Sequence, residues 1–573
     1  MTDIDYYTLR AYLYPREVNQ KVFFTLTEIE KVLKYSKQNV KKKLKRYHEL
    51  GYLEYLPGRG RGNQSCLIFK ESFYSEVNKV LKQELANKNI NFSLSIVQLN
   101  IPRSWFFSFR KELNEIFEMH GTDNNSDTIR LLLNRKLATL NPLVASLSFE
   151  SFLIQNLSKT LLKYNVTDKK VEPCIAHHWE HNKDFTKWTF DIRKHIYFHH
   201  GRELDSLDVK HTFFNAQKGL TSKWLVSNIK DIICDTPYRI TFSLSYPDPF
   251  FEKIVSHYPL VILPRDVLFN EDSWIGCGKF ILEEKKEDYL LLKAFPNYFK
   301  ELPLTDKIEF WYIKKDIHYP MLYSPSKESH KEEIVKITKE RCGVHYLIFS
   351  QKTQNYVVNN YMRKALCQIL DIGKMGKDLK KDHITPISSF FFRISGFDQK
   401  EENILDLIEK SNYKGQTLIL GLIDHPRVIE DGKWFVNEAQ KFGIKLILRP
   451  YKFDSDFYKT ELEFKTHMSF GSEIPTSDIE IGFLDFILND TLLLNRFLSK
   501  KHLLEINQMA QNYRMKTNSG SRKIISLEIE NYLLSNNLLK YTYRPCKHFN
   551  VQSLIQGFEV DENGNVDLGK IWI

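Results

Sequence analysis

The chain has 573 residues, more than one ordinary hydrophobic core accommodates, and this length predicts several domains. Hydrophobic residues make up 42% of the chain and aromatic residues 13%, which excludes an intrinsically disordered protein. The formal net charge is +11, and no stretch reaches about 18 consecutive apolar residues, so we expect no membrane-spanning helix.

Two further features predict a cytoplasmic protein. The opening MTDIDYYTLR has neither a basic nor an apolar leader region, so we expect no signal peptide. The seven cysteines are odd in number, scattered and never in a CxxC pair. They favour reduced thiols over a disulfide framework or a zinc site.

Two short helices are predicted at the start of the chain. Residues 3–14 bring apolar side chains to one face. The stretch TEIEKVLK follows, with Thr27 as its capping residue and Glu30 at the capping-box spacing. The residues expected to face inward are Ile4, Tyr7, Ala11, Ile29, Val32 and Leu33.

A third helix is predicted in SKQNVKKKLKRYHELG. Ser36 is a favourable N-cap, and Gly51 can end the helix in the left-handed conformation. Val40, Leu44 and Tyr47 recur at helical spacing and form one buried stripe. A short helix, a tight turn and a second helix with polar first-turn residues are typical of a helix-turn-helix.

The charge is concentrated around this third helix. Residues 34–70 hold ten Lys or Arg and only two acidic residues, a net +8. Amides in the first helical turn can pair with base edges, and cations in later turns can meet phosphates. The alternative is a solvated lysine-rich face. The predicted DNA contacts here are Ser36, Lys37, Gln38, Asn39, Lys41, Lys42, Lys43, Lys45 and Arg46.

Two predicted strands, residues 52–56 and 65–69, flank the glycine-rich stretch PGRGRGNQ. Its spacing fits neither the dinucleotide loop nor the phosphate-binding P-loop, and a strand follows where both motifs need a helix. We therefore expect a hairpin wing. Residues 1–72 are predicted to be a winged helix-turn-helix that binds double-stranded DNA; the alternative is a domain for protein contacts alone. The predicted wing contacts are Arg59, Arg61, Asn63 and Gln64.

Residues 73–125 are predicted to be a helical connector with stripes around Phe73 and Trp105. A homodimer contact and a coupling element between the two ends of the chain both fit this segment. The remainder, residues 126–573, alternates short apolar strands with helices, which favours a mixed α/β architecture. The expected strands lie in DTIRLLLN, WTFDIR, RITFSLS, YLLLKAF, KIEFWYI, HYLIFS, QTLILGLI and GIKLILR.

The large region resembles the family 5 solute-binding proteins of ABC importers. The matches run in order: LATLNPLVASLSFESFLIQNLSKTLLKYN at 137–165, a stretch at 172–209, WIGCGKF, FPNYF and MRKALCQILD at 362–371. This resemblance implies a two-lobed, type II periplasmic-binding-protein-like domain. The matching positions within 172–209 are Pro173, Ala176, Trp179, Trp188, Phe190, Arg193, Phe198, Gly201, Asp208 and Val209.

A winged helix joined to such a domain resembles the SgrR-type bacterial transcriptional regulators. The resemblance implies a multidomain α+β and α/β protein that senses a sugar-phosphate, sugar or peptide-like solute in its cleft. Asp485, with Phe483 in place of the family's tryptophan, matches the segment that can anchor a peptide amino group. The alternative for Asp485 is an ordinary strand-end or cap aspartate.

Catalysis, a metal site and a cofactor are not expected. The sequence contains no G-x-S-x-G or H-E-x-x-H signature. Neighbouring histidines such as His177 and His178 point to opposite faces of a strand, so they are poorly placed to chelate one ion. The rival function is that of a solute- or oligopeptide-binding component of an ABC transporter.

Overall fold

The chain forms two compact units. One comprises residues 1–135 with 309–331, and the other residues 136–308 with 332–573. The computed structural model describes residues 3–33, 35–58, 64–86, 92, 96, 99, 105, 127–133, 136–312, 321–323, 334–340, 343–353, 358–381, 384–391, 402–452, 462–475, 478–544, 546–553, 555–562 and 564–573.

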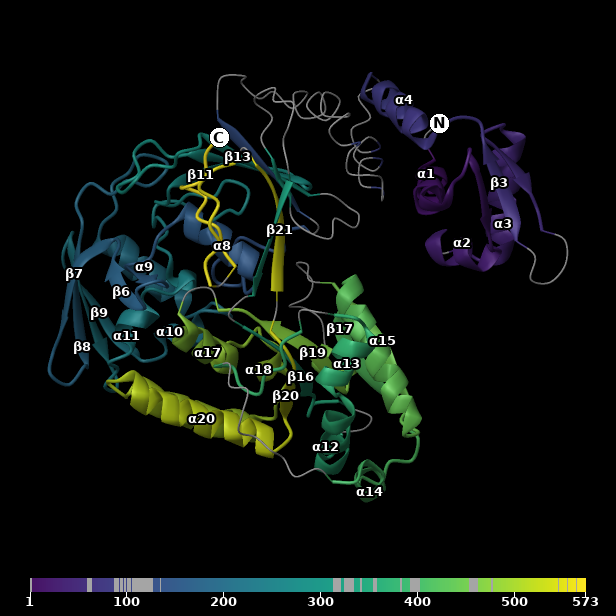
Figure 1. Cartoon of the computed structure of the whole chain (residues 1–573). Helices are drawn as coiled ribbons and strands as arrows, with labels where there is room; N and C mark the ends of the chain where they lie inside the picture. Colours follow the sequence, from purple (N-terminus) through teal and green to yellow (C-terminus); the bar gives the residue numbers. More distant parts are fainter. Residues whose placement is uncertain are drawn as a thin grey trace. The chain divides into compact units, whose positions relative to one another are not determined.

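The first unit opens with helices and a small sheet (Figure 1). The sheet is three-stranded and antiparallel, in the order β1-β3-β2. A further strand pair, β4 with β14, is also antiparallel. The elements are α1 (Ile4–Leu13), η1 (Tyr14–Arg16), β1 (Lys21–Phe24), α2 (Leu26–Leu33), α3 (Lys37–Glu49), β2 (Leu53–Leu56), β3 (Ser65–Phe69), α4 (Phe73–Ala86), β4 (Thr128–Leu133) and β14 (Met321–Tyr323).

A winged helix-turn-helix is confirmed: α2 and α3 are its two helices, and β2 and β3 form its hairpin. Val40, Leu44 and Tyr47 of α3 are buried as expected, and so are Tyr7, Ala11, Ile29 and Leu33; Ile4 and Val32 are partly buried. One detail was wrong. α2 begins at Leu26, and the Thr25 hydroxyl accepts from the Glu28 amide, so the cap precedes the predicted Thr27 by two residues.

The first part of the predicted connector belongs to the core of this unit. The apolar stripe of α4 is buried with the side chains of α1 to α3. Arg10 of α1 is fully buried, pairs with Glu76 of α4 and lies 4.0 Å from the centre of the Phe69 ring. These contacts fix α4 against α1 and β3. The boundary after residue 72 stays a prediction.

The second unit is a mixed α/β structure that contains a four-stranded and a five-stranded sheet. Its helices are α8 (Ser148–Leu157), α9 (Ser206–Ala216), α10 (Lys223–Val226), α11 (Phe251–Ile254), η2 (Tyr258–Leu260), α12 (Asn360–Ile369), α13 (Ile372–Asp378), α14 (Ile404–Lys410), α15 (Pro426–Lys441), α16 (Leu462–Lys465), α17 (Ile479–Leu488), α18 (Leu493–Phe497), α19 (Lys500–Arg514) and α20 (Ser519–Ser535). Its strands are β5 (Leu162–Asn165), β6 (Lys170–Pro173), β7 (Ala176–His181), β8 (Lys187–Ile192), β9 (Ile229–Thr236), β10 (Arg239–Leu244), β11 (Phe280–Lys285), β12 (Tyr289–Ala294), β15 (Ile334–Glu340), β16 (Val344–Phe349), β17 (Leu418–Ile423), β18 (Leu446–Tyr451), β19 (Met468–Glu473), β20 (Leu539–Tyr541) and β21 (Cys546–Gln552). One more strand, β13 (Lys307–Tyr312), lies where the chain passes between the units.

The two sheets differ in topology. The first is four-stranded and antiparallel, in the order β7-β8-β10-β9. The second has five strands in the order β18-β17-β19-β16-β20, with β17 parallel to both of its neighbours. Figure 1 shows α12, α13 and α15 beside the second sheet. All eight predicted strand stretches of residues 126–573 contain a strand. Within the described part of the chain, no helix is both long and apolar enough to cross a bilayer.

Candidate functional sites: a basic helix face and an apolar pocket

The helix α3 is held at both ends by its backbone. Ser36 occupies the N-cap position, and its carbonyl accepts from the Val40 amide; its side chain forms no capping bond. At the other end Gly51 has a φ of +71°, as predicted. The amides of Gly51 and Tyr52 donate to the carbonyls of His48 and Tyr47, which is the Schellman arrangement.

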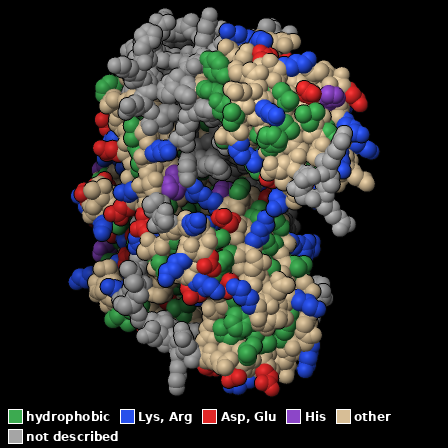
Figure 2. Space-filling model, turned by 45° about the vertical axis from the view of Figure 1, so that its right-hand side comes forward, with side chains coloured by type: hydrophobic (Ala, Val, Ile, Leu, Met, Phe, Trp, Pro, Cys, Tyr) green, Lys and Arg blue, Asp and Glu red, His purple; other side chains and the backbone are tan. Residues whose placement is uncertain are grey.

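The outward face of α3 is exposed and cationic. Lys37, Lys41, Lys42, Lys45 and Arg46 are all exposed, and none of them forms an ion pair with a described residue. The side chains of Ser36, Gln38 and Asn39 are exposed in the first turn of the helix. On the face of the molecule drawn in Figure 2, Lys and Arg side chains lie among hydrophobic ones.

The hairpin residues are described only in part. Gln64 is exposed beside the start of β3, and the Gly58 amide donates to the Ser65 hydroxyl at 3.2 Å. Arg59, Arg61 and Asn63 lie outside the described residues, and their predicted contact with DNA stays a prediction. The structure also adds β1, which the sequence reading missed. It pairs with β3 and completes the sheet behind the hairpin.

Lys43 differs from the other cations of α3 because it turns back toward α1. Its ammonium pairs with Asp5 and lies 3.7 Å from Asp3. Burial alone would lower the pKa of Lys43, but the two carboxylates raise it. Tyr35 and Tyr47 donate to the same two carboxylates, at 3.0 and 2.8 Å. Lys43 therefore anchors α3 to the start of α1 and is not part of the outward cationic face.

Asp485 lies in the middle of α17, so it is neither a strand-end nor a cap aspartate. Its Oδ1 accepts from the Trp224 indole at 3.2 Å and from the Asn489 amide at 3.0 Å. The His257 ring lies 3.8 Å from the same oxygen. These contacts make Asp485 an acceptor between α17 and α10, and it does not line the pocket described below.

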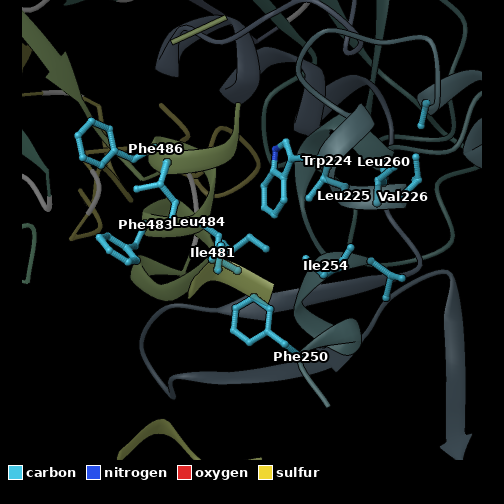
Figure 3. Packing of buried hydrophobic residues seen from close by; sticks show 14 of the residues in the cluster. Trp224, Leu225, Val226, Phe250, Ile254, Leu260, Ile481, Phe483, Leu484 and Phe486 are labelled. Atoms are coloured by element: carbon cyan, nitrogen blue, oxygen red, sulfur yellow. The ribbon is translucent and has the colours of Figure 1, made fainter. Parts of the chain in front are cut away.

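Phe483, the other residue expected near a ligand, has a fully buried side chain, and its ligand role stays a prediction. Its ring centre lies 5.5 Å from that of Phe390 and 5.0 Å from that of Phe391. Figure 3 shows Trp224 of α10 on one side of α17 and the rings of Phe483 and Phe486 on the other side, all within one buried cluster. The phenylalanine that replaces the family's tryptophan is a core residue here.

The second unit contains a cavity of about 260 Å³ beside its five-stranded sheet. Its walls come from β16, β17, β18 and β19, the helices α13 and α15, the loop before α8, the turn between α17 and α18, and the segment after β20. The lining is mostly apolar and tyrosine-rich, with two carboxylates, Asp431 and Glu473. None of the described residues that line it is Lys or Arg.

Glu473 is the unusual group of this pocket. It ends β19, is partly buried and accepts a hydrogen bond from the fully buried Tyr346 hydroxyl at 3.0 Å. Burial raises the pKa of Glu473 to about 8; the Tyr346 bond opposes this rise, and the Asp485 charge adds to it. Among the described residues no cation pairs with Glu473.

The other carboxylate, Asp431 of α15, already has partners. Lys381 pairs with it, and the Tyr543 hydroxyl donates to it at 2.6 Å. Burial raises the pKa of Asp431, and Lys381 and Tyr543 oppose that rise. Its charge is therefore satisfied inside the protein, which leaves Glu473 as the acidic group available to a ligand.

The conspicuous histidines have structural partners. His178 lies 3.2 Å from Asp191, and His200 lies 3.1 Å from Asp266. His199 contacts the Gly278 carbonyl, and burial lowers the pKa of His199 to about 4. No group of three or more His, Cys, Asp or Glu side chains among the described residues is arranged to hold a metal ion.

Two family models match the chain. The model of the bacterial extracellular solute-binding proteins, family 5, matches residues 170–491. The N-terminal model of the sugar transport-related sRNA regulator matches residues 5–106. The first match contains most of the pocket, and the second contains the whole of α3 and the hairpin.

Individual relatives repeat this pattern. The uncharacterized protein YhjP of Bacillus subtilis is 24% identical over 97% of both chains. The HTH-type transcriptional regulator SgrR of Yersinia pestis is 26% identical, over 62% of this chain and 63% of its own length. The murein tripeptide binding protein MppA of Escherichia coli superimposes with a TM-score of 0.65 at 14% identity, covering 78% of this chain and 99% of its own. The type II binding-protein fold expected for the second unit is confirmed.

Proposed function

Because the chain belongs to the family 5 solute-binding proteins and carries an SgrR-type N-terminal domain, we propose that it is a DNA-binding transcriptional regulator controlled by a small solute. The observation that carries this proposal is the outward face of α3. Five cations that form no ion pair with a described residue, and two amides, lie on one side of a helix whose other side is buried in the core. Such a surface fits the major groove.

The DNA-binding part is tested by the salt dependence of binding. Changing Lys42→Ala together with Arg46→Ala removes two phosphate contacts and should lower the slope of log K against log salt by roughly 1.8. The matched control is Lys500→Ala with Lys501→Ala, two exposed lysines of α19. Equal slopes for wild type and the α3 variant would reject this face.

For the solute, we propose an amine-bearing, peptide-like molecule rather than a sugar-phosphate. A phosphate needs cationic or amide donors, whereas this pocket presents the Glu473 carboxyl and lacks Lys and Arg in its described lining. An ammonium group beside Glu473 would favour its ionised form and supply the missing counter-charge. The small volume suits a compact ligand. We propose binding at this site and no catalysis.

Thermal shift of the full chain tests the ligand class. A panel of small dipeptides with free amino groups should raise Tm, because a ligand at about 100 times its Kd stabilises by about 2.7 kcal/mol. The N-acetylated forms of the same peptides and glucose 6-phosphate should have no effect, and Glu473→Gln should abolish the shift. A shift with the sugar-phosphate alone would overturn the amine assignment and leave the regulator proposal standing.

The rival is a solute- or oligopeptide-binding component of an ABC transporter, and the matched family is named for extracellular solute-binding proteins. The two functions require different locations, since a regulator must reach the chromosome. We therefore propose a cytoplasmic location. Cell fractionation decides between them: recovery outside the cytoplasmic membrane would restore the transporter component.

A further inference from the structure

The outer face of the sheet β1-β3-β2 carries exposed apolar side chains on both of its edge strands. Its alternate residues Val22, Leu67 and Tyr55 point into the core, so the residues between them point outward. Phe23 and Leu56 lie on the outer side and are 53% and 44% exposed, whereas Cys66, which pairs with both, is buried between them. Isolated exposed apolar residues are ordinary, but a row across a sheet marks an interaction surface.

Charged residues stand beside this apolar row. Lys21 and Glu54 both pair with Ile68 of β3, one on each side, so they form a second row next to Phe23 and Leu56. Both are exposed, and neither has an ion-pair partner among the described residues; Lys21 lies 5.3 Å from the centre of the Phe23 ring. The sheet face therefore has a cation on one edge strand and an anion on the other.

We propose that this face is where two copies of the chain associate. A twofold axis parallel to the strands places β1 of one copy over β2 of the other at the same height. Phe23 then faces the partner copy's Leu56, and Lys21 faces the partner copy's Glu54, each twice. Face-to-face sheets pack about 10 Å apart, a gap that these side chains fill.

The other in-plane twofold axis, perpendicular to the strands, lacks this complementarity. It would place β1 over β1 and β2 over β2, so Lys21 of one copy could not face Glu54 of the other. The parallel axis also sends both β2–β3 hairpins to the same end of the dimer. Two α3 helices can then approach one duplex, as dyad-related half-sites require. The inference concerns self-association and does not depend on the identity of the solute.

The first test is the mass of the full chain by analytical ultracentrifugation without DNA. Wild type should sediment as a species of twice 67.9 kDa at micromolar concentration. Phe23→Glu should weaken the dimer at least about tenfold, whereas Leu268→Glu, at a 93% exposed residue of the second unit, should not. A monomeric wild type, or a Phe23→Glu variant that dimerises like wild type, would overturn the proposal.

Mixing two charge-reversal variants tests the pairing itself. Lys21→Glu alone and Glu54→Lys alone each place like charges together and should be mainly monomeric. In a heterodimer of the two variants, residue 21 of each copy faces an opposite charge at residue 54 of the other copy. An equimolar mixture should therefore form the heterodimer. Native mass spectrometry identifies the species. A mixture that stays monomeric would refute this axis, and far-UV circular dichroism verifies that every variant is folded.

Discussion

The Glu473 carboxyl makes the stability of the protein depend on pH in a defined direction. Its pKa is raised from an ordinary 4.5 to about 8 in the folded state. Between these values the folded state keeps a proton that the unfolded state has released, so stability falls as pH rises. We expect Glu473→Gln to reduce the loss of Tm between pH 5 and 8.5. Calorimetry of wild type and variant measures Tm across this pH range. Parallel curves of Tm against pH would contradict the raised pKa.

Gly471 is required because the Tyr346 side chain packs against it, and not because of the backbone angles of Gly471. A Cβ at this position would lie 2.3 Å from Cζ of the fully buried Tyr346 ring. We expect Gly471→Ala to destabilise the protein by about 1–3 kcal/mol and to weaken solute binding, because Tyr346 holds Glu473. Gly376→Ala in α13 is the control, since its Cβ would meet nothing closer than 3.9 Å. Unfolding in denaturant measures the difference, and equal free energies would reject this role.

At this scale the sequence predicted core residues better than pocket residues. The stripe Val40, Leu44 and Tyr47 follows from helical spacing alone, and it is buried as expected. The acidic residue of the pocket was missed: Asp485 was predicted, but its carboxylate bonds Trp224, and Glu473 lines the cavity. Such a choice depends on contacts between residues 127 and 261 positions apart, which no local pattern encodes.

Among the elements, α3 carries the most specific prediction. Gln38 and Asn39 are exposed in its first turn, where a recognition helix meets base edges. We expect Gln38→Ala or Asn39→Ala to cost roughly 1–3 kcal/mol on the specific operator and little on random duplex, because amides read adenine edges. Fluorescence anisotropy on both duplexes measures this. Equal losses on the two would show that these amides do not read bases.

The elements were largely predictable where apolar runs are long. Stretches such as QTLILGLI are strands because consecutive β-branched and aliphatic residues suit a buried sheet. The four-residue strand β1, KVFF, was missed because so short a run has no distinctive period. The cap of α2 shifted by two residues because both Thr25 and Thr27 suit that role, and only the fold selects Thr25.

At the scale of the whole molecule, the family pattern made the joining of a winged helix to a binding-protein fold predictable. The order of motifs carried that inference, since each motif alone is weak. The pairing Lys21–Ile68–Glu54 across three strands was not predictable, because it depends on β1, which was missed, and on its register. Long-range register is set by packing and hairpin geometry together.

The regulator proposal makes one demand on the molecule as a whole. If a solute changes the affinity for DNA by some factor, then DNA must change the affinity for the solute by the same factor, because both pass through one thermodynamic cycle. We expect a coupling of roughly 5- to 150-fold.

The coupling is measured by anisotropy with and without saturating amine-bearing dipeptide, and by calorimetric titration of the dipeptide with and without operator. Glu473→Gln is the control: it should remove the solute's effect on DNA binding while leaving DNA affinity itself unchanged. If both ligands bind and neither changes the affinity for the other, the pocket and α3 act independently. In that case the solute could not control the DNA-binding face, whatever the affinity of either site.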